Sequence, residues 1–165
     1  MAPQVTDFSF WNEMWKQSYY DREKGIRANP LLAYWDKRAN DFSLMRKSND
    51  YDFGRKVYAA LSSVLTPDSS MLDIGAGPGS FTIPFAQHIK SVTAIEPSKG
   101  MVTVLKENAK EVNVENINII EELVQDLPQD GSPDFQFDLV TISLVLWMFP
   151  DVWLRLLQME QYSKG

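Results

Sequence analysis

The sequence predicts a doubly wound α/β fold, in which a mainly parallel, Rossmann-like sheet carries helices on both faces and an N-terminal helical cap. From residue 66 onward, short apolar runs alternate with helix-length segments, the pattern of right-handed βαβ units. One apolar run, at 70–74, leads directly into a glycine-rich turn and a helix start. The chain has 165 residues, 44% of them hydrophobic and 23% charged, which suffices for the core of one domain.

The first 65 residues are predicted to form the helical cap. An amphipathic stripe at helical spacing indicates a first helix and consists of Phe8, Trp11, Trp15 and Tyr19. A second helix is expected over 31–42, after the break at Asn29 and Pro30. A third is expected over 51–65, and its N-terminal caps are expected to come from Ser48, Asn49 and Asp50.

Residues 66–165 are predicted to form the sheet-containing core, as one structural unit with the cap. The expected strands cover 70–74, 91–96, 117–121 and 137–143, in the spatial order 3-2-1-4. The expected helices cover 80–90, 98–113 and 150–161, with Ser98 as the N-cap of the second.

Charge and composition exclude several classes of function. The net charge is −6, but residues 1–60 carry +2 and residues 61–165 carry −8. An acidic body disfavours nucleic acid as a partner and is compatible with a small cationic ligand. No apolar run is long enough to span a membrane and no signal-peptide pattern is present, so we expect a cytoplasmic protein. Cysteine is absent, and no spacing of other residues suggests a metal site.

The glycine-rich turn is the most informative motif. Asp73 is followed at alternate positions by Gly75, Gly77 and Gly79, so the third glycine comes one residue earlier than in the dinucleotide fingerprint G-x-G-x-x-G. The carboxylate of Asp73 would repel a pyrophosphate and attract an ammonium or sulfonium group. A nicotinamide-dependent oxidoreductase is therefore a disfavoured alternative.

A second acid, Glu96, limits which ligands the predicted site could bind. Glu96 ends the second predicted strand, at the same edge of the sheet as the glycines, where a carboxylate can accept hydrogen bonds from both hydroxyls of a ribose. Taken singly, Asp73 could be a turn former and Glu96 a helix-initiating acid. Together with the glycines they predict a nucleoside with a positively charged amino-acid tail, which describes S-adenosylmethionine.

Segments 72–81, 94–101 and 137–151 resemble the first, second and fourth motifs of class I S-adenosylmethionine-dependent methyltransferases. The closest resemblance is to the subgroup that modifies small molecules and quinone-type substrates. It implies a set of cofactor-binding residues: Asp73, Gly75, Ala76, Gly77, Gly79, Glu96, Pro97, Met101, Glu122, Leu123 and Ser143. For Met101, a place in the core is an equally good interpretation.

The chain departs from the family pattern in two loops. Leu123 replaces the family's adenine-binding Asp, so adenine would meet Leu123 and Val124, with Glu122 or Asp126 as polar substitutes. Trp147 and Met148 stand where many relatives carry histidines, so no catalytic residue is assigned. The only histidine, His88, is expected to have a structural role.

The predicted sheet also stops early. The family's sheet has seven strands, and this chain ends where the fifth should begin. We expect either a truncated chain or an apolar edge of the fourth strand that pairs with a partner, for instance in a homodimer. The predicted function is methyl transfer from S-adenosylmethionine to a small molecule. The alternative is a non-catalytic module that binds this cofactor or another protein.

Overall fold

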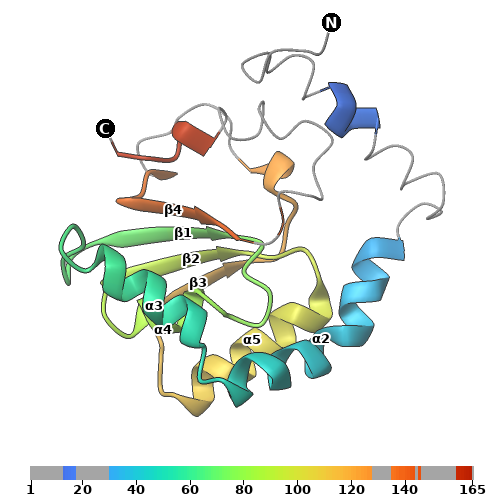
Figure 1. Cartoon of the computed structure of the whole chain (residues 1–165), viewed down its shortest axis with the longest axis horizontal. Coiled ribbons are helices and arrows are strands. Elements are labelled where there is room, and N and C mark those ends of the chain that lie inside the picture. Colours follow the sequence, from blue (N-terminus) through green and yellow to red (C-terminus); the bar gives the residue numbers. More distant parts are fainter. Residues whose placement is uncertain (1–12, 18–29, 128–134, 144, 146–158, 165) are drawn as a thin grey trace, which may run out of the picture.

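The computed structural model describes residues 13–17, 30–127, 135–143, 145 and 159–164. Residues 13–17 are helical. The elements that follow are α2 (Pro30–Ser48), α3 (Asp52–Leu61), β1 (Ser70–Ile74), α4 (Thr82–Ala86), β2 (Ser91–Ile95), α5 (Lys99–Glu111), β3 (Ile117–Ile120), the short 3₁₀ helix η1 (Val124–Asp126) and β4 (Leu139–Ile142). Figure 1 shows their arrangement.

The four strands form one parallel sheet in the order β3-β2-β1-β4, which confirms the predicted topology. β1 has the predicted bounds, and β2 and β3 each end one residue earlier than predicted. Because β1 lies between β2 and β4, the chain changes direction across the sheet at the carboxyl end of β1. Ligands of such sheets bind at that point.

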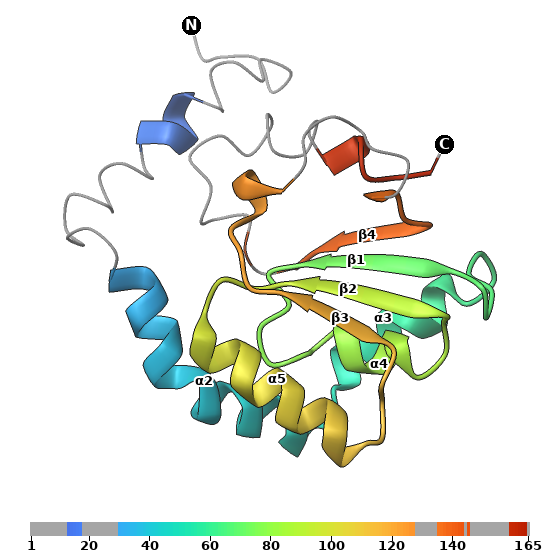
Figure 2. The same ribbon diagram turned by 180° about the vertical axis from the view of Figure 1, so that it is seen from behind.

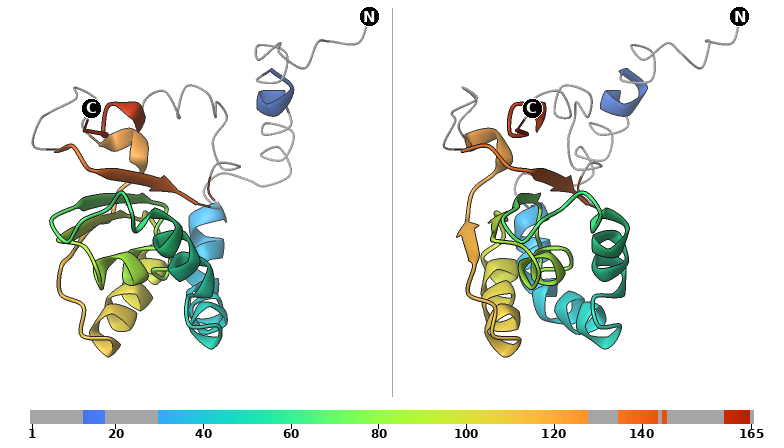
Figure 3. Two further views of the ribbon diagram at one scale, coloured as in Figure 1. Left: turned by 60° about the vertical axis from the view of Figure 1, so that its left-hand side comes forward. Right: turned by 90° about the vertical axis from the view of Figure 1, so that its left-hand side faces the viewer.

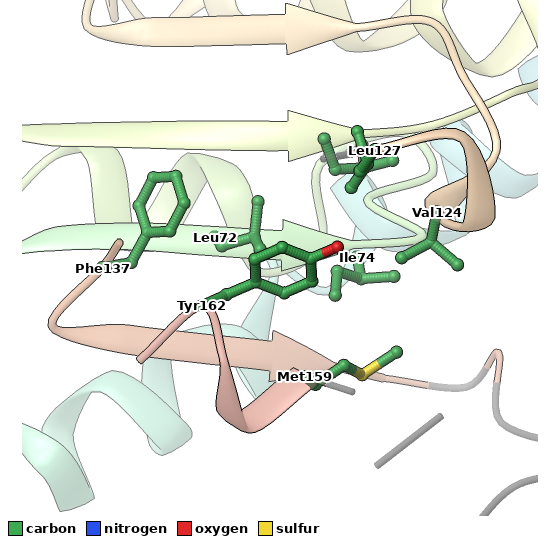
Figure 4. Close-up of a cluster of buried hydrophobic side chains, with 8 residues drawn as sticks. Leu72, Ile74, Val124, Leu127, Phe137, Met159 and Tyr162 are labelled. Carbon is green, nitrogen blue, oxygen red and sulfur yellow. The ribbon is translucent and has the colours of Figure 1, made fainter. Parts of the chain in front are cut away.

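Helices α2 to α5 lie on one side of the sheet, and η1 and residues 159–164 lie on the other, as Figures 2 and 3 show from further directions. Successive side chains of β1 pack on opposite faces of the sheet: Met71 lies on the side of α4 and Leu72 on the side of η1. On the η1 side, Leu72 and Ile74 pack in a buried cluster with Val124, Leu127, Phe137, Met159 and Tyr162 (Figure 4).

The cap helices differ in length from the prediction. α2 continues six residues beyond the expected end at 42, because Ser43 and Lys47 find partners on α5, in Asn108 and Glu111. α3 ends at Leu61, four residues early. The predicted capping by Ser48, Asn49 and Asp50 is wrong, since the residue before α3 is Tyr51, in the left-handed region at φ 54° and without a side-chain cap.

The predicted helix over 80–90 is much shorter in the structure, where α4 covers five residues. The cause is a distant side chain. The amide of Asn116 donates hydrogen bonds to the carbonyl oxygens of Ala86 and Ile89, each at 2.9 Å. These carbonyls are thereby satisfied without further helical turns, and the chain can turn directly into β2.

β4 is shorter than predicted, and all four of its residues are half-buried. Its outer edge is also covered at one point. Asp138 donates its N–H to Ser70 on β1, so Phe137 faces the other way, and there it forms a parallel bridge with Ser163. The edge that the sequence predicted to be open to a partner is therefore occupied at Phe137 by a residue of the same chain.

Several predictions fall outside the described residues. They concern Phe8, Trp11 and Tyr19 of the first stripe, Trp147 and Met148, and the helix over 150–161 except its end, where Met159 and Glu160 are helical. Within the described ranges, no helix is long and apolar enough to cross a membrane.

Candidate cofactor site

The glycine-rich loop follows β1 and is fastened to the end of β2. The N–H groups of Gly75 and Ala76 both donate to the carbonyl oxygen of Ile95, at 2.8 and 3.1 Å. Gly75, Gly77 and Gly79 all have positive φ, at 72°, 54° and 98°. The loop therefore follows a backbone path that other residue types adopt only at a cost in free energy.

Gly77 differs from the other two glycines in its surroundings. A Cβ added at Gly75 would lie 2.4 Å from a methyl of Val145, and one at Gly79 would lie 2.7 Å from Leu105. Among the residues that the structure describes, none has a heavy atom within 4 Å of a Cβ at Gly77. The described part of the chain therefore leaves open space beside Gly77.

Glu96, directly after β2, lies against the loop. Its Oε2 accepts the N–H of Gly77 and its Oε1 accepts the N–H of Ser98, both at 2.9 Å. Each oxygen keeps a second lone pair, so the carboxylate can still accept two hydroxyl donors. Burial raises the pKa of Glu96, the two N–H donors oppose that rise, and the charges of Asp73 and Asp36 add to it.

Asp73 is placed deeper than the sequence suggested. Its side chain is 2% exposed. Oδ2 accepts the hydroxyl of Thr82 at 2.6 Å, and Oδ1 accepts the hydroxyl of Thr141 at 2.9 Å. Burial raises the pKa of Asp73, against the effect of these hydroxyl donors. Asp73 thus joins β1 to α4 and β4 beneath the loop.

Sequence reasoning missed Thr82 and Thr141. The sequence signal of Thr141 was that it is the only polar residue of β4, but its register with Asp73 is known only from the structure. Thr82 carried a weaker signal as the first residue of α4, directly behind the loop.

The remaining predicted site residues divide into two groups. Ala76 is buried beside Ala94 and Leu105, while Pro97 and Ser143 are half-buried near the carboxyl ends of the strands. Glu122 and Leu123 are exposed at the entrance to η1, whereas Val124 packs into the core.

Met101, the predicted adenine contact, is 3% exposed and packs with Ala39 of α2 and Val104. This is the core position that was the alternative interpretation. His88 is exposed and stacks on Tyr58, with ring centroids 4.4 Å apart. In the described part of the chain, no three acidic or histidine side chains are grouped as a metal site would require.

Comparison with known proteins decides the family. Residues 71–160, more than half of the chain, match the model of the family described as "Methyltransferase domain". The chain belongs to this family. Its fold is that of the class I methyltransferases, and S-adenosylmethionine is the cofactor of the family.

Two solved structures illustrate the likeness in fold of this methyltransferase domain. The YcgJ protein from Bacillus subtilis superposes with a TM-score of 0.59 at 24% identity, over 69% of this chain and 47% of that one. A protein from Methanococcus maripaludis, named as an S-adenosyl-L-methionine-dependent methyltransferase, superposes with a TM-score of 0.68 at 22% identity, over 79% and 59%.

Curated relatives of the methyltransferase domain match it over only part of their length. The uncharacterised methyltransferase YcgJ of Bacillus subtilis is 33% identical over 82 residues, which are 50% of this chain and 31% of that protein. The tRNA/tmRNA (uracil-C(5))-methyltransferase of Helicobacter hepaticus is 40% identical over 63 residues, 37% of this chain and 16% of that enzyme. The alignments thus span a third or less of these relatives.

Proposed function

We propose that this methyltransferase domain binds S-adenosylmethionine at the glycine-rich loop and transfers its methyl group to a small molecule. The observation that carries the proposal is the pairing of Glu96 with Gly77 beside an open space. The ribose hydroxyls would donate to Glu96, and the methionine part would lie along the loop. We also propose that residues 1–65 form a helical cap and residues 66–165 the cofactor-binding core of one structural unit.

The reaction would be a direct displacement at the methyl carbon. A lone pair of the acceptor forms the new bond, the C–S bond breaks, and its electron pair returns to sulfur. The positive charge passes from sulfur to the acceptor, which then releases a proton to water if it carries one, and S-adenosylhomocysteine remains. We propose no protein base in this step: the acceptor would itself be a good nucleophile, and positioning would supply most of the acceleration.

Charge favours a small acceptor over RNA. Residues 61–165, which include the site, carry a net charge of −8. RNA affinity depends mainly on basic side chains that neutralise phosphates. The relatives that methylate tRNA and rRNA nevertheless make RNA the second candidate, to be separated by experiment.

Substitution of Glu96 tests the cofactor site. We expect E96A to weaken S-adenosylhomocysteine binding by about 10- to 100-fold in isothermal titration calorimetry, because hydrogen bonds to a charged group contribute about 1.5–3 kcal/mol. E107A is the matched control, since Glu107 is exposed on α5. Unchanged affinity in E96A would contradict the site, and tighter binding of NADH would favour the oxidoreductase.

The acceptor class can be tested with methyl-labelled S-adenosylmethionine. Label that enters the small-molecule fraction of a cell extract supports the proposal, and label that enters RNA supports the second candidate. Cofactor binding without any transfer would indicate the non-catalytic module.

The homodimer that the sequence led us to expect, formed through the edge of β4, remains a proposal. Gel filtration at several protein concentrations tests it.

A further inference from the structure

Helix α2 lies along α5 (Figures 1 and 2). The carboxylate of Asp36 on α2 reaches the N-terminus of α5. Oδ1 of Asp36 accepts the hydroxyl of Ser98 at 2.6 Å and the N–H of Gly100 at 2.9 Å. These two donors lower the pKa of Asp36, the Ser98 hydroxyl most strongly. Asp36 therefore stays ionised and acts as a cap supplied by another helix.

The two helices touch at Gly100. A Cβ added there would lie 2.7 Å from the carbonyl oxygen of Asp36 and 2.8 Å from its Cα. Only a glycine at this position allows α2 to come so close. The absence of a side chain at Gly100 and the carboxylate of Asp36 are thus two independent features of one contact.

Ser98 connects this contact to the proposed ribose site. Its side chain is 1% exposed, and its hydroxyl donates to Asp36 while accepting the N–H of Met101 at 3.2 Å. The backbone N–H of the same residue donates to Oε1 of Glu96. Because Asp36 fixes the position of Ser98, it also fixes one of the two donors that orient Glu96.

A second polar connection joins α2 to the other end of the site. Asn108 of α5 is 3% exposed, and its amide donates to the hydroxyl of Ser43 at 2.8 Å and to the carbonyl oxygen of Pro78 at 2.9 Å. Pro78 stands between Gly77 and Gly79. α2 is therefore linked to both the ribose-binding acid and the glycine-rich loop, without touching either directly in these contacts.

We infer that Asp36 is a positioning residue for the ribose of the cofactor, acting through Ser98 on Glu96. The inference rests on the proposed function, because it requires a ribose at Glu96. It gives α2 a role beyond covering the sheet: its docking sets how well the site holds the nucleoside. Removal of Asp36 should therefore weaken the binding of a ligand more, the more hydrogen bonds its ribose makes with Glu96.

The experiment compares two ligands by calorimetry, S-adenosylhomocysteine and its analogue that lacks the ribose 2′-hydroxyl. We expect D36A to weaken the binding of S-adenosylhomocysteine about tenfold and the binding of the 2′-deoxy analogue less than about threefold. D36N keeps an acceptor oxygen for Ser98 and Gly100, so it should stay within about threefold of the wild type for both ligands. D41A, at an exposed aspartate of the same helix, should change neither.

A general loss of structure would give a different result, in which D36A weakens both ligands equally, and this would overturn the inference. So would a D36A variant that binds both ligands like the wild type. If D36A fails to fold, G100A provides the second variant, because its Cβ pushes α2 away, and the same selective loss is expected. If the wild type fails to bind S-adenosylhomocysteine at all, the proposed function itself fails.

Discussion

At the residue scale, the three glycines of the loop serve different purposes although they share a positive φ. Gly79 allows close packing, since a Cβ there would collide with Leu105 and Ile83 at 2.7 and 2.8 Å. At Gly77, by contrast, a Cβ would meet none of the residues that the structure describes within 4 Å. A methyl group added at each position therefore separates the effect on folding from the effect on ligand binding.

We expect G79A to lower the free energy of unfolding by about 2 kcal/mol or more, through overpacking and backbone strain together. G77A should lower the free energy of unfolding by only about 1–2 kcal/mol, through backbone strain alone. It should nevertheless weaken S-adenosylhomocysteine binding at least about tenfold, because its methyl group enters the proposed site. Urea unfolding and calorimetry measure the two effects. A G77A variant with wild-type affinity would contradict the proposed position of the ligand.

At the scale of the element, contacts distant in sequence decide where helices stop. α4 ends at Ala86 because Asn116, 30 residues further along the chain, donates to the carbonyl oxygen of Ala86 and to that of Ile89, just beyond the helix. The local sequence continues with Gln87 and His88, which any helix could accommodate. A local pattern therefore predicts the start of such a helix better than its end.

Substitution of Asn116 tests this explanation. We expect N116A to lower the free energy of unfolding by about 1–2 kcal/mol, because it leaves two carbonyls of the α4 turn without their donor. N49A, at an exposed asparagine, is the matched control and should stay within about 0.5 kcal/mol of the wild type. Equal effects of the two substitutions in urea unfolding would exclude Asn116 as the cause.

The difference between local patterns and contacts distant in sequence also explains which parts of the site could be predicted. The loop and Glu96 were predictable because strand, glycines and acid follow one another within a short stretch of chain. Asp36 was not, because its partner Ser98 is 62 residues away, and the Thr141–Asp73 hydrogen bond spans 68 residues. Such pairs become visible only when the strand register and the packing of α2 are known.

At the scale of the whole molecule, acids at opposite ends of the sheet respond to pH in opposite directions. Burial raises the folded-state pKa of Asp73 and Glu96 at the carboxyl ends of the strands, so their ionisation lowers stability as pH rises above the usual carboxyl range. At the other end, Lys164 and the N–H and hydroxyl of Ser70 lower the pKa of Asp138 to about 2.

The sign for Asp138 follows from its lowered pKa. Its stabilisation is fully present above the ordinary value of 3.8 and is lost as the pH falls toward about 2. We therefore expect D138N to be less stable than the wild type at neutral pH, with a difference that shrinks below about pH 4. Urea unfolding over a pH series measures this, with D68N at an exposed loop as control. A difference independent of pH would show that ionisation of Asp138 is not its source.

The strand order also has a kinetic consequence. β1 meets β2 after about twenty residues of chain, whereas the contact between Ser70 and Asp138 that aligns it with β4 closes a separation of 68 residues. Long-range parallel pairing is slow to form. A nascent chain in which β1, β2 and β3 have already paired still exposes the apolar edge of β1, and such an edge recruits other chains. β1, an interior strand of the finished sheet, is therefore the last strand to have both its edges protected, and we expect the chain to be prone to aggregation until β4 has paired with it.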